Sequence, residues 1–379
     1  TGGSYKLGDI VDVTVQFSEA VLVTGTPQLS LQVGANARLA TYQVGNNPNT
    51  LTFRYTIAAG DTDIDGISIN ANALNLNRGT ISDSAGNAAV ITNALVGANG
   101  NTKVDSTLPT LASTEVINGN VVLTFSEDLG GTSVTPSFFT LSPSNTISGA
   151  TISGRTVTLT PSTSITAGSA GASVSYNDNS TPDLSSGVIQ DLAGNDAASF
   201  SNAAATKVTA SGPITLAATT TFTTAVLSGT TNDALTGNAA ANTLTGNSGA
   251  NRITGGGAAD NLTGLGGADT FAYTTNSDSL LAGFDKINDF VIGTDSIDAA
   301  LSSGALGASK GAVTALTSAA ISAVLTNTSF AATTNAAWFT FGTRTFLALN
   351  DGVRGFSAST DSIIEMTGVT GNMANLTVI

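Results

Sequence analysis

The chain has 379 residues and a formal net charge of −14, with 41% hydrophobic and only 10% charged residues. Such an acidic surface repels duplex nucleic acid and anionic lipid, whereas a divalent cation suits it. Because the chain has no cysteine and no histidine, disulfide bonds, thiol catalysis, serine–histidine triads and HExxH zinc sites are excluded. The abundance of glycine, with 42 residues, is typical of β-rich modules with many turns.

Other classes of protein are disfavoured by what the chain lacks. No apolar run reaches the ~20 residues that a membrane-spanning helix needs, so we expect no transmembrane segment. Neither G-x-S-x-G nor a phosphate-binding GxxxxGK[ST] loop occurs, so we expect no enzyme within these residues. The sequence begins without methionine or a signal peptide, which predicts the carboxy-terminal part of a longer or processed chain.

Residues 1–105 are predicted to form an antiparallel β-sandwich. The run IVDVTVQF at 10–17 alternates apolar and polar residues, which is the period-two pattern of a half-buried strand. LSLQV at 29–33 and LTFRYTI at 51–57 repeat this pattern. Short strands separated by Gly, Asn and Pro turns are typical of a sandwich.

Residues 106–209 are predicted to form a second sandwich of the same kind. FSE occurs at Phe17–Glu19 and again at Phe125–Glu127, and DSAGN from Asp83 is matched by DLAGN from Asp191. Both pairs have the same spacing of 108 residues, which indicates a duplicated domain. We interpret the two DxAGN segments as turns, because Asn and Gly tolerate positive φ.

These two units resemble the Ig-like sandwich repeats of long bacterial surface proteins, especially cyanobacterial ones. The first unit carries the resemblance in YKLGDIVDVTVQFSEAV and TPQLSL, and the second in NGNVVLTFSEDL and VIQDLAGNDAA. The resemblance implies an architecture of two Ig-like sandwiches. It implies no particular activity.

Residues 210–300 contain the repeat around which the chain is organised. From Ser228 to Ala272 one nonapeptide occurs five times: SGTTNDALT, GNAAANTLT, GNSGANRIT, GGGAADNLT and GLGGADTFA. The eighth position is always large and apolar, and the sixth always carries a short side chain with an acceptor oxygen. The pattern matches the RTX-type nonapeptide, whose stacking forms a parallel β-roll with calcium in its turns.

The sixth-position residues are the first candidate calcium ligands. Two nonapeptides make one turn of a β-roll, so residues 18 apart are expected to stack. The predicted ladders are Asp233, Asn251 and Asp269 on one side, and Asn242, Asp260 and Asp278 on the other. Calcium affinity rises with ligand charge, so we expect the strongest site where Asp260 meets Asp278. A calcium-free solenoid held by asparagine stacking and the Leu/Ile core is the alternative.

An acidic segment follows the repeat. With DTF, SDS, the DxIxDF element and GTDSID, it resembles the segment that closes the roll in serralysin-type carboxy-terminal domains. The resemblance implies that several calcium ions lie between successive turns, held by sixth-position side chains and loop carbonyls. It also implies further calcium ligands at Asp285, Asp289, Asp295 and Asp298. The alternative for these four residues is an ordinary solvated strand-and-turn surface.

A third acidic group, Asp61, Asp63 and Asp65, lies in the first predicted sandwich. Its GDTDIDG sequence has the spacing of an EF-hand loop, but Asn72 stands where the terminal glutamate is required. A sandwich-edge calcium site and a solvated acidic loop are both left open.

Residues 301–379 are predicted to form a β-rich cap with one short helix. GAVTALTSAAISAVLT at 311–326 has apolar residues at helical spacing, and strands are expected within 338–356 and 359–369. This tail resembles the end module of cyanobacterial surface proteins that carry roll repeats. Proteins of that kind leave the cell by type I secretion with an uncleaved carboxy-terminal signal.

The sequence thus predicts a secreted calcium-binding protein at the cell surface of a Gram-negative bacterium. It would be a component of an S-layer or similar coat, and its roll would fold on calcium outside the cell. Expected partners are calcium, further copies in a surface lattice, and the outer membrane or its lipopolysaccharide, but not nucleic acid. A calcium-dependent adhesin is one alternative. The other is the secretion and stability module of an extracellular enzyme with its catalytic domain upstream.

Overall fold

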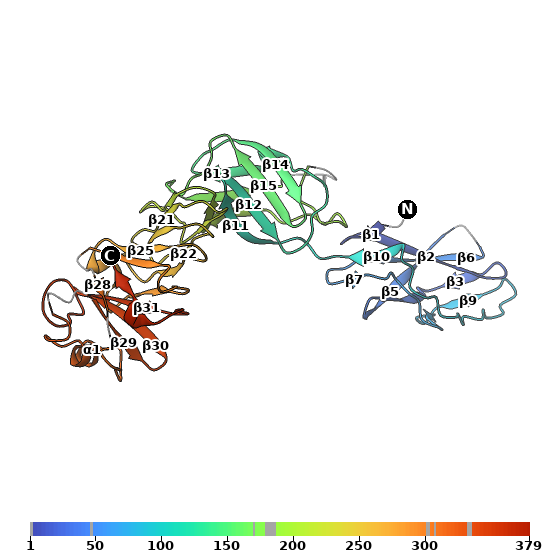
Figure 1. Cartoon of the computed structure of the whole chain (residues 1–379). Coiled ribbons are helices and arrows are strands. Elements are labelled where there is room, and N and C mark those ends of the chain that lie inside the picture. Colours follow the sequence, from blue (N-terminus) through green and yellow to red (C-terminus); the bar gives the residue numbers. More distant parts are fainter. Residues whose placement is uncertain are drawn as a thin grey trace.

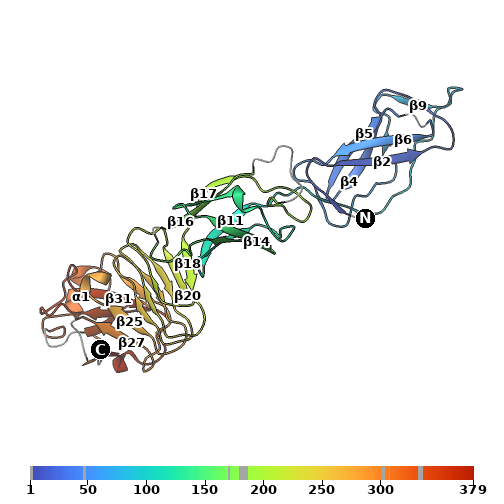
Figure 2. The same ribbon diagram turned by 90° about the horizontal axis from the view of Figure 1, so that it is seen from above.

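The computed structural model describes residues 3–45, 48–169, 171–178, 187–300, 304–306, 308–331 and 336–379. Strands dominate these residues, and a single α-helix occurs among them. The chain is elongated, with its N-terminal sheets at one end and its last strands at the other (Figure 1). Figure 2 shows the same elongation from above. The predicted all-β fold is confirmed. Within the described ranges, no helix combines the length and the apolar character that crossing a bilayer requires.

The N-terminal part of the chain forms antiparallel sheets around one core. The largest sheet has the order β2 (Ile10–Gln16), β6 (Thr50–Thr56), β5 (Asn36–Gln43), β4 (Gln28–Val33) and β8 (Leu74–Asn75). The smaller sheets are β1 (Gly3–Tyr5), β10 (Thr102–Asp105) and β7 (Thr62–Asp63), and the pair β3 (Leu22–Thr24) and β9 (Thr80–Ser82). Leu31 and Phe53 are fully buried in the core, which is where the alternating patterns predict them.

The second unit has two facing sheets. One contains the antiparallel neighbours β14 (Ile147–Ser153), β15 (Thr156–Pro161), β12 (Asn120–Phe125) and β11 (Leu111–Ile117). The other contains β13 (Phe139–Ser142), which follows the 3-10 helix η1 (Pro136–Phe138), then β16 (Ala172–Tyr176) and β17 (Phe200–Ala205). Leu123 and Phe125 of β12 share one core with Tyr176 of the facing sheet. Alternation along β12 therefore builds a sandwich.

The nonapeptides form a continuous stack of short parallel strands in two sheets. One sheet takes β20 (Thr224–Leu227), β22 (Thr243–Thr245), β24 (Asn261–Thr263) and β26 (Asp285–Ile287). The other takes β19 (Ile214–Thr215), β21 (Ala234–Thr236), β23 (Arg252–Thr254), β25 (Thr270–Tyr273) and β27 (Ser296–Ala299). The five eighth-position side chains are 0–1% exposed between the sheets: Leu235, Leu244, Ile253, Leu262 and Phe271. The period of nine thus places every apolar anchor in one core, as expected of a β-roll.

The roll is continuous with the elements on either side of it. β18 (Lys207–Ala210) pairs in parallel with β11 of the second sandwich and with β20 of the roll. At the other end, β26 pairs in parallel with β31 (Ser362–Met366). One twelve-stranded sheet therefore crosses both predicted domain boundaries, those after residues 209 and 300.

The cap packs against the end of the roll. β31, β30 (Arg344–Leu349) and β29 (Ala336–Phe341) are antiparallel neighbours. On the other sheet, β32 (Thr377–Val378), which follows the 3-10 helix η3 (Met373–Asn375), pairs with β27 and with β28 (Gly304–Ala305). Phe339 and Phe346 stack with ring centroids 5.3 Å apart in the cap core.

The helix of the cap is shorter than the sequence predicts. α1 spans Ser318–Val324, with Thr317 accepting a hydrogen bond from Ala320 N, whereas the apolar spacing predicts a helix over 311–326. The first residues of that range pair with β29 instead, since Val313 N donates to Thr340 O at 2.8 Å. Tertiary pairing therefore overrides helical spacing at the start of this segment.

The stacked core gives a first testable prediction. We expect Leu244→Ala to lower the free energy of unfolding of the roll by about 2–5 kcal/mol, because a fully buried leucine leaves a cavity. Leu265→Ala is the matched control, since Leu265 lies in the same roll and is 57% exposed. Denaturant unfolding monitored by circular dichroism measures both. Equal effects of the two substitutions would contradict the packing described.

Candidate metal sites

Hydrogen bonds between turns hold the first ladder of sixth-position side chains. Asn242, Asp260 and Asp285 lie directly before, or at the start of, β22, β24 and β26. Asn242 N donates to Asp260 Oδ1 at 2.7 Å, and Asp260 N donates to Asp285 Oδ1 at 2.9 Å. Each carboxylate therefore accepts from the ladder residue one turn earlier and is fixed in direction by that bond.

Asp278 does not occupy the place in this ladder that the count of 18 predicts. It lies in the 3-10 helix η2 (Asn276–Ser279), where its carboxylate accepts from Thr275 N at 2.9 Å. The chain makes this excursion between two strands of the roll, so Asp285, 25 residues after Asp260, stands above it instead. The predicted Asp260–Asp278 ladder pair was wrong, and its place is taken by Asp260 and Asp285.

The second ladder has the same hydrogen bonds. Asn251 N donates to Asp269 Oδ1 at 2.8 Å, and Asp269 N donates to Asp295 Oδ1 at 3.0 Å. Asp233 begins this ladder, with its side chain bonded to Thr231 Oγ1 and its carbonyl oxygen 3.4 Å from Asn251 Nδ2. Asp233, Asn251, Asp269 and Asp295 are therefore brought together in one row.

Besides Asp278, two more of the predicted ligands lie outside both rows. Asp289 accepts from Gly264 N at 2.9 Å and from Leu265 N at 2.7 Å. Its side chain therefore holds the loop of the preceding turn in place. Asp298 forms an exposed ion pair with Arg252, with 2.6 Å between Arg252 Nη2 and Asp298 Oδ2. Both carboxylates already have protein partners at the roll surface.

Glycine leaves the space that the ladder oxygens fill. A Cβ atom on Gly255 would lie 2.3 Å from Asp260 Oδ2, and one on Gly264 would lie 2.4 Å from Asp269 Oδ2. Real Cβ atoms do not approach other atoms so closely. The first glycine of these nonapeptides is therefore required by the carboxylate five residues later rather than by backbone freedom.

The first ladder carries carboxylate charge that the protein does not neutralise. Asp260 is 2% exposed and Asp285 is 0% exposed, and Oδ2 of each has no hydrogen-bond partner among the described residues. Burial, with a contribution from Asp278, raises the pKa of Asp260 to about 7. Burial, with contributions from Asp260 and Asp278, raises the pKa of Asp285 to about 8. Buried carboxylates without partners are costly, so this pair requires either protons or a cation.

The donor set fits calcium. The free atoms in the first ladder are carboxylate oxygens, and calcium prefers six to eight oxygen ligands of mixed type, roughly 2.4 Å away. Histidine and cysteine, which softer metals prefer, are absent from the chain. In the second ladder, burial and the charges of Asp295 and Asp289 raise the pKa of Asp269 to about 6. A hard divalent cation would therefore stabilise the charge of the first row, and in the second row chiefly that of Asp269, because Asp295 Oδ2 already accepts from Val291 N at 2.7 Å.

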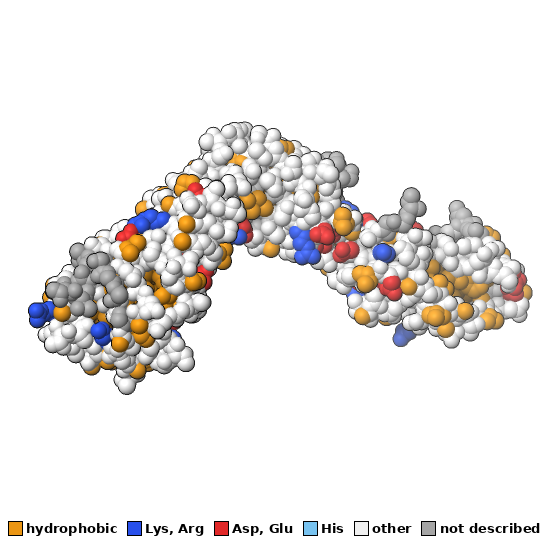
Figure 3. All heavy atoms as spheres, in the orientation of Figure 1, with side chains coloured by type: hydrophobic (Ala, Val, Ile, Leu, Met, Phe, Trp, Pro, Cys, Tyr) orange, Lys and Arg blue, Asp and Glu red, His pale blue; other side chains and the backbone are white. Residues whose placement is uncertain are grey.

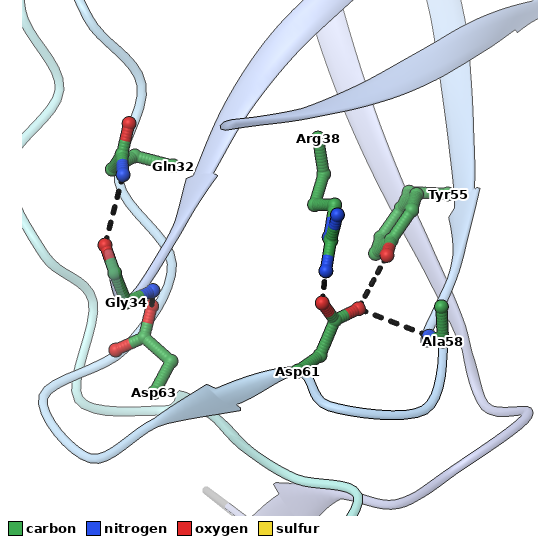
Figure 4. A network of polar contacts seen from close by, with 7 residues as sticks. All are labelled: Gln32, Gly34, Arg38, Tyr55, Ala58, Asp61 and Asp63. Carbon is green, nitrogen blue, oxygen red and sulfur yellow. Dashed lines mark hydrogen bonds and ion pairs between the residues drawn. The ribbon is translucent and has the colours of Figure 1, made fainter. Parts of the chain in front are cut away.

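The acidic group of the first sandwich is different, because the protein uses the oxygens of Asp61 and Asp63, whereas Asp65 is exposed. Asp61 accepts from Arg38 Nε at 2.6 Å, from Ala58 N at 2.9 Å and from the Tyr55 hydroxyl (Figure 4). Burial opposes ionisation of Asp61, but these three donors outweigh it and lower its pKa. Asp63 accepts from the backbone N–H groups of Gly34 and Gly66. The network is a structural brace and does not have the open oxygens of an EF-hand loop.

A carboxylate cluster that the sequence reasoning missed lies where the two sandwiches meet. One oxygen from each of Asp105, Glu127 and Asp191 lies within 4.8 Å of the others. The DLAGN segment does form a turn, since Asp191 Oδ1 accepts from Asn195 N at 2.8 Å. Glu127 belongs to FSE and Asp191 to DLAGN, so the repeated pair of motifs was the signal that could have found this cluster. Figure 3 shows acidic side chains on the visible face near this junction.

Protonation of the ladder carboxylates gives a pH prediction for the calcium-free protein. The pKa values of about 7 for Asp260 and about 8 for Asp285 lie above the unfolded value of about 3.9. The folded state then binds more protons than the unfolded state, so stability is full at low pH and is lost as pH rises through 7 to 8. We expect the thermal midpoint of calcium-depleted protein to fall between pH 6 and pH 8.5.

The double variant Asp260→Asn with Asp285→Asn is the control for this pH dependence. Asparagine cannot titrate, so the fall in midpoint between pH 6 and pH 8.5 is expected to flatten. A midpoint in the native chain that rises over this range would contradict the prediction.

The junction cluster gives a prediction of its own. Burial and the charges of Asp191 and Asp105 raise the pKa of Glu127, so its negative charge destabilises the folded chain when no cation is present. We expect Glu127→Gln to raise the free energy of unfolding in chelator by about 0.5–1 kcal/mol. Asp128→Asn is the control, because Asp128 is an exposed neighbour with a loose contact of 3.4 Å to Arg155. Destabilisation by Glu127→Gln in chelator would contradict the repulsion.

Comparison with known proteins places these ladders in a family. The model of the family described as peptidase M10 serralysin C terminal matches residues 35–345. A search of curated proteins finds no match. The matched range runs from the first sandwich through both ladders into the cap. Domains of this RTX type generally bind calcium, and modules of this type belong to secreted proteins. Because the match covers most of its length, the chain belongs to the peptidase M10 serralysin C-terminal family.

Proposed function

We propose that this chain is a structural, calcium-dependent part of a secreted cell-surface protein, and that its roll completes folding when calcium reaches it outside the cell. The observation that carries the proposal is the pair Asp260 and Asp285, which are buried with one unpartnered carboxylate oxygen each. A protein that works at neutral pH needs a counter-charge for this pair. Calcium fits the oxygen donors and matches the family.

In this proposal the ladder residues bind the calcium ion. Because the chain is acidic, folding of the roll depends on that binding. Asp260 and Asp285 would bind in one row, and Asp269 with Asp295 in the other. Bound calcium supplies the positive charge that offsets their mutual repulsion. With a net charge of −14, the chain is poorly compensated when calcium is scarce, as in a cytosol. Free energy of binding then becomes free energy of folding on export.

The arrangement of the chain supports a role in a coat. The second sandwich, the roll and the cap share one continuous sheet, and the first sandwich extends this row to an elongated, bent molecule (Figure 1). Few charged side chains appear on the face in Figure 3, a surface suited to packing beside similar copies. We place this elongated molecule in an S-layer or similar coat on a Gram-negative cell, attached to the outer membrane or its lipopolysaccharide.

The proposal assigns no catalysis to these residues. The chain has no histidine, and the buried carboxylates stand in ladders rather than in a substrate cleft. An adhesin is less well supported, because none of the exposed large apolar side chains in the described residues is aromatic. Aromatic side chains are the usual anchors of binding surfaces.

Calcium titration of the full chain tests the proposal. We expect calcium at millimolar concentration to raise the thermal midpoint of unfolding, relative to chelator at pH 7.5. We also expect it to increase the β-strand signal in the far-ultraviolet circular dichroism spectrum. A site that is 100-fold saturated adds about 2.7 kcal/mol to the free energy of unfolding. Magnesium at the same concentration is expected to do less, because it requires a tighter octahedral site.

The variants Asp260→Asn and Asp128→Asn separate the ladder from general charge effects. Asp260→Asn is expected to remove much of the calcium response, whereas Asp128→Asn, at an exposed carboxylate outside both ladders, is expected to keep it. An unchanged midpoint and spectrum in the native chain with and without calcium would refute the proposed function.

A further inference from the structure

The end of the roll holds a group of polar side chains that solvent does not reach. Asp260 and Tyr273 are each 2% exposed, and Ser279 and Asp285 are each 0% exposed. Within the described ranges, Asp260 Oδ2, Tyr273 Oη and Asp285 Oδ2 have no hydrogen-bond partner. Three orphaned oxygens in one buried group are unusual, because buried polar atoms are nearly always bonded.

These side chains interact electrostatically across the end of the roll. Burial and the nearby carboxylates of Asp285 and Asp260 raise the pKa of Tyr273 well above its usual value. The hydroxyl of Tyr273 and the carboxylate of Asp285 are thus neighbours, although no hydrogen bond of ordinary geometry joins them. The two carboxylates and the hydroxyl affect one another's ionisation, and together they offer oxygen atoms of the kind that a hard cation binds.

The cap covers this group. Ser279 Oγ accepts from Asp285 N at 2.7 Å and donates to Ile363 O of β31 at 2.5 Å. The parallel register of β26 and β31 sets Asp285 beside Ile364. On the other side of η2, Ser362 Oγ donates to Asn276 O at 2.8 Å. Strand β31 is therefore bonded to both ends of η2, and its pairing with β26 holds it beside Asp285.

The second ladder is less enclosed. Asp295, its last residue, is only half-buried, and β27 beside it has a single residue pair with the cap strand β32, Ile297 with Val378. The corresponding residue of the first ladder, Asp285, is fully buried, and β26 has three pairs with β31. The two ladders thus differ in how an ion could leave them.

We propose that a calcium ion held by Asp260 and Asp285 is enclosed by β31 and exchanges with solvent only when β31 separates from the roll. This inference rests on the proposed function, because it takes calcium as the occupant. It adds that the two ladders exchange their ions at very different rates. Calcium in the first ladder is trapped as the cap docks, and it holds the cap in place in return.

Release of calcium into chelator tests the enclosure. Calcium-saturated full chain is mixed with excess chelator, desalted at successive times, and the remaining calcium per chain is measured by mass spectrometry. We expect a rapid phase from the second ladder and a slow phase of about one ion per chain. The slow phase should be at least about a hundredfold slower, because it requires local opening of a paired strand.

Matched variants assign the slow phase. Asp285→Asn is expected to abolish it and leave the rapid phase, whereas Asp295→Asn, at the equivalent place in the second ladder, is expected to keep it. Ser279→Ala is expected to retain the ion but release it faster, since the bridge between Asp285 N and Ile363 O is lost. Ser277→Ala is the control for Ser279→Ala, because Ser277 is exposed in the same 3-10 helix.

The outcomes distinguish this inference from the proposed function. Binding of calcium with uniformly rapid release would overturn the enclosure and leave the proposed function standing, whereas a native chain that binds no calcium would overturn both. A slow phase that survives Asp285→Asn would overturn the assignment to this ladder. Circular dichroism establishes that each variant is folded. Should Asp285→Asn fail to fold, release from Ser279→Ala no faster than from Ser277→Ala overturns the role of β31.

Discussion

The hydrogen bond between successive turns is the interaction on which the roll depends. In each ladder, a side-chain oxygen accepts from the backbone N–H of the ladder residue one turn earlier, as Asp260 does from Asn242. This bond fixes the stacking of the turns, so the apolar eighth-position side chains meet between the two sheets. It occupies one oxygen of each carboxylate and leaves the other to find a partner elsewhere. The same contact therefore supplies structural register and a demand for a cation.

Asparagine and aspartate both supply a side-chain acceptor to the ladders, but they differ in charge and in the donor they bond. Asn242 and Asn251 accept from backbone N–H groups of their own turns, whereas the aspartates accept from the ladder residue one turn earlier. Asn242 and Asn251 stand in the turns next to the second sandwich, whereas Asp260, Asp285, Asp269 and Asp295 follow toward the cap. The sandwich end of the roll can therefore stack without a cation, with β18 as its template. Stacked carboxylates raise each other's pKa values and repel one another when ionised. The need for a counter-charge is thus concentrated at the cap end of the roll.

Regular patterns in the sequence predicted the fold well, and irregular excursions limited the prediction. The nonapeptide period placed Leu235 to Phe271 in the core, because a fixed period determines which residues share a face. The count of 18 failed after Phe271, because η2 inserts residues between two paired strands and no local pattern shows their number. The start of the predicted helix failed because Val313 is bonded to β29. The repeated motifs point to Glu127 and Asp191, but the cluster was missed because its third member, Asp105, comes from the first sandwich and motif spacing does not show how the two sandwiches meet.

Because Asp285 lies in β26, the strand that pairs with the cap, neutralising its charge and completing the sheet depend on each other. A stack of parallel strands ends in a row of unpaired backbone groups, which is open to association with other chains. In this chain β31 pairs with that row, β30 and β29 continue it, and residues 310–313 bond to β29 at the outer edge. The strand that closes the row is the same strand that covers Asp285. Because β31 follows Asp285 by a long stretch of chain, the cap must return to the roll before the last carboxylate of the first ladder is buried. A cation that neutralises Asp285 removes the main electrostatic cost of that return, so ion binding and docking of the cap favour each other.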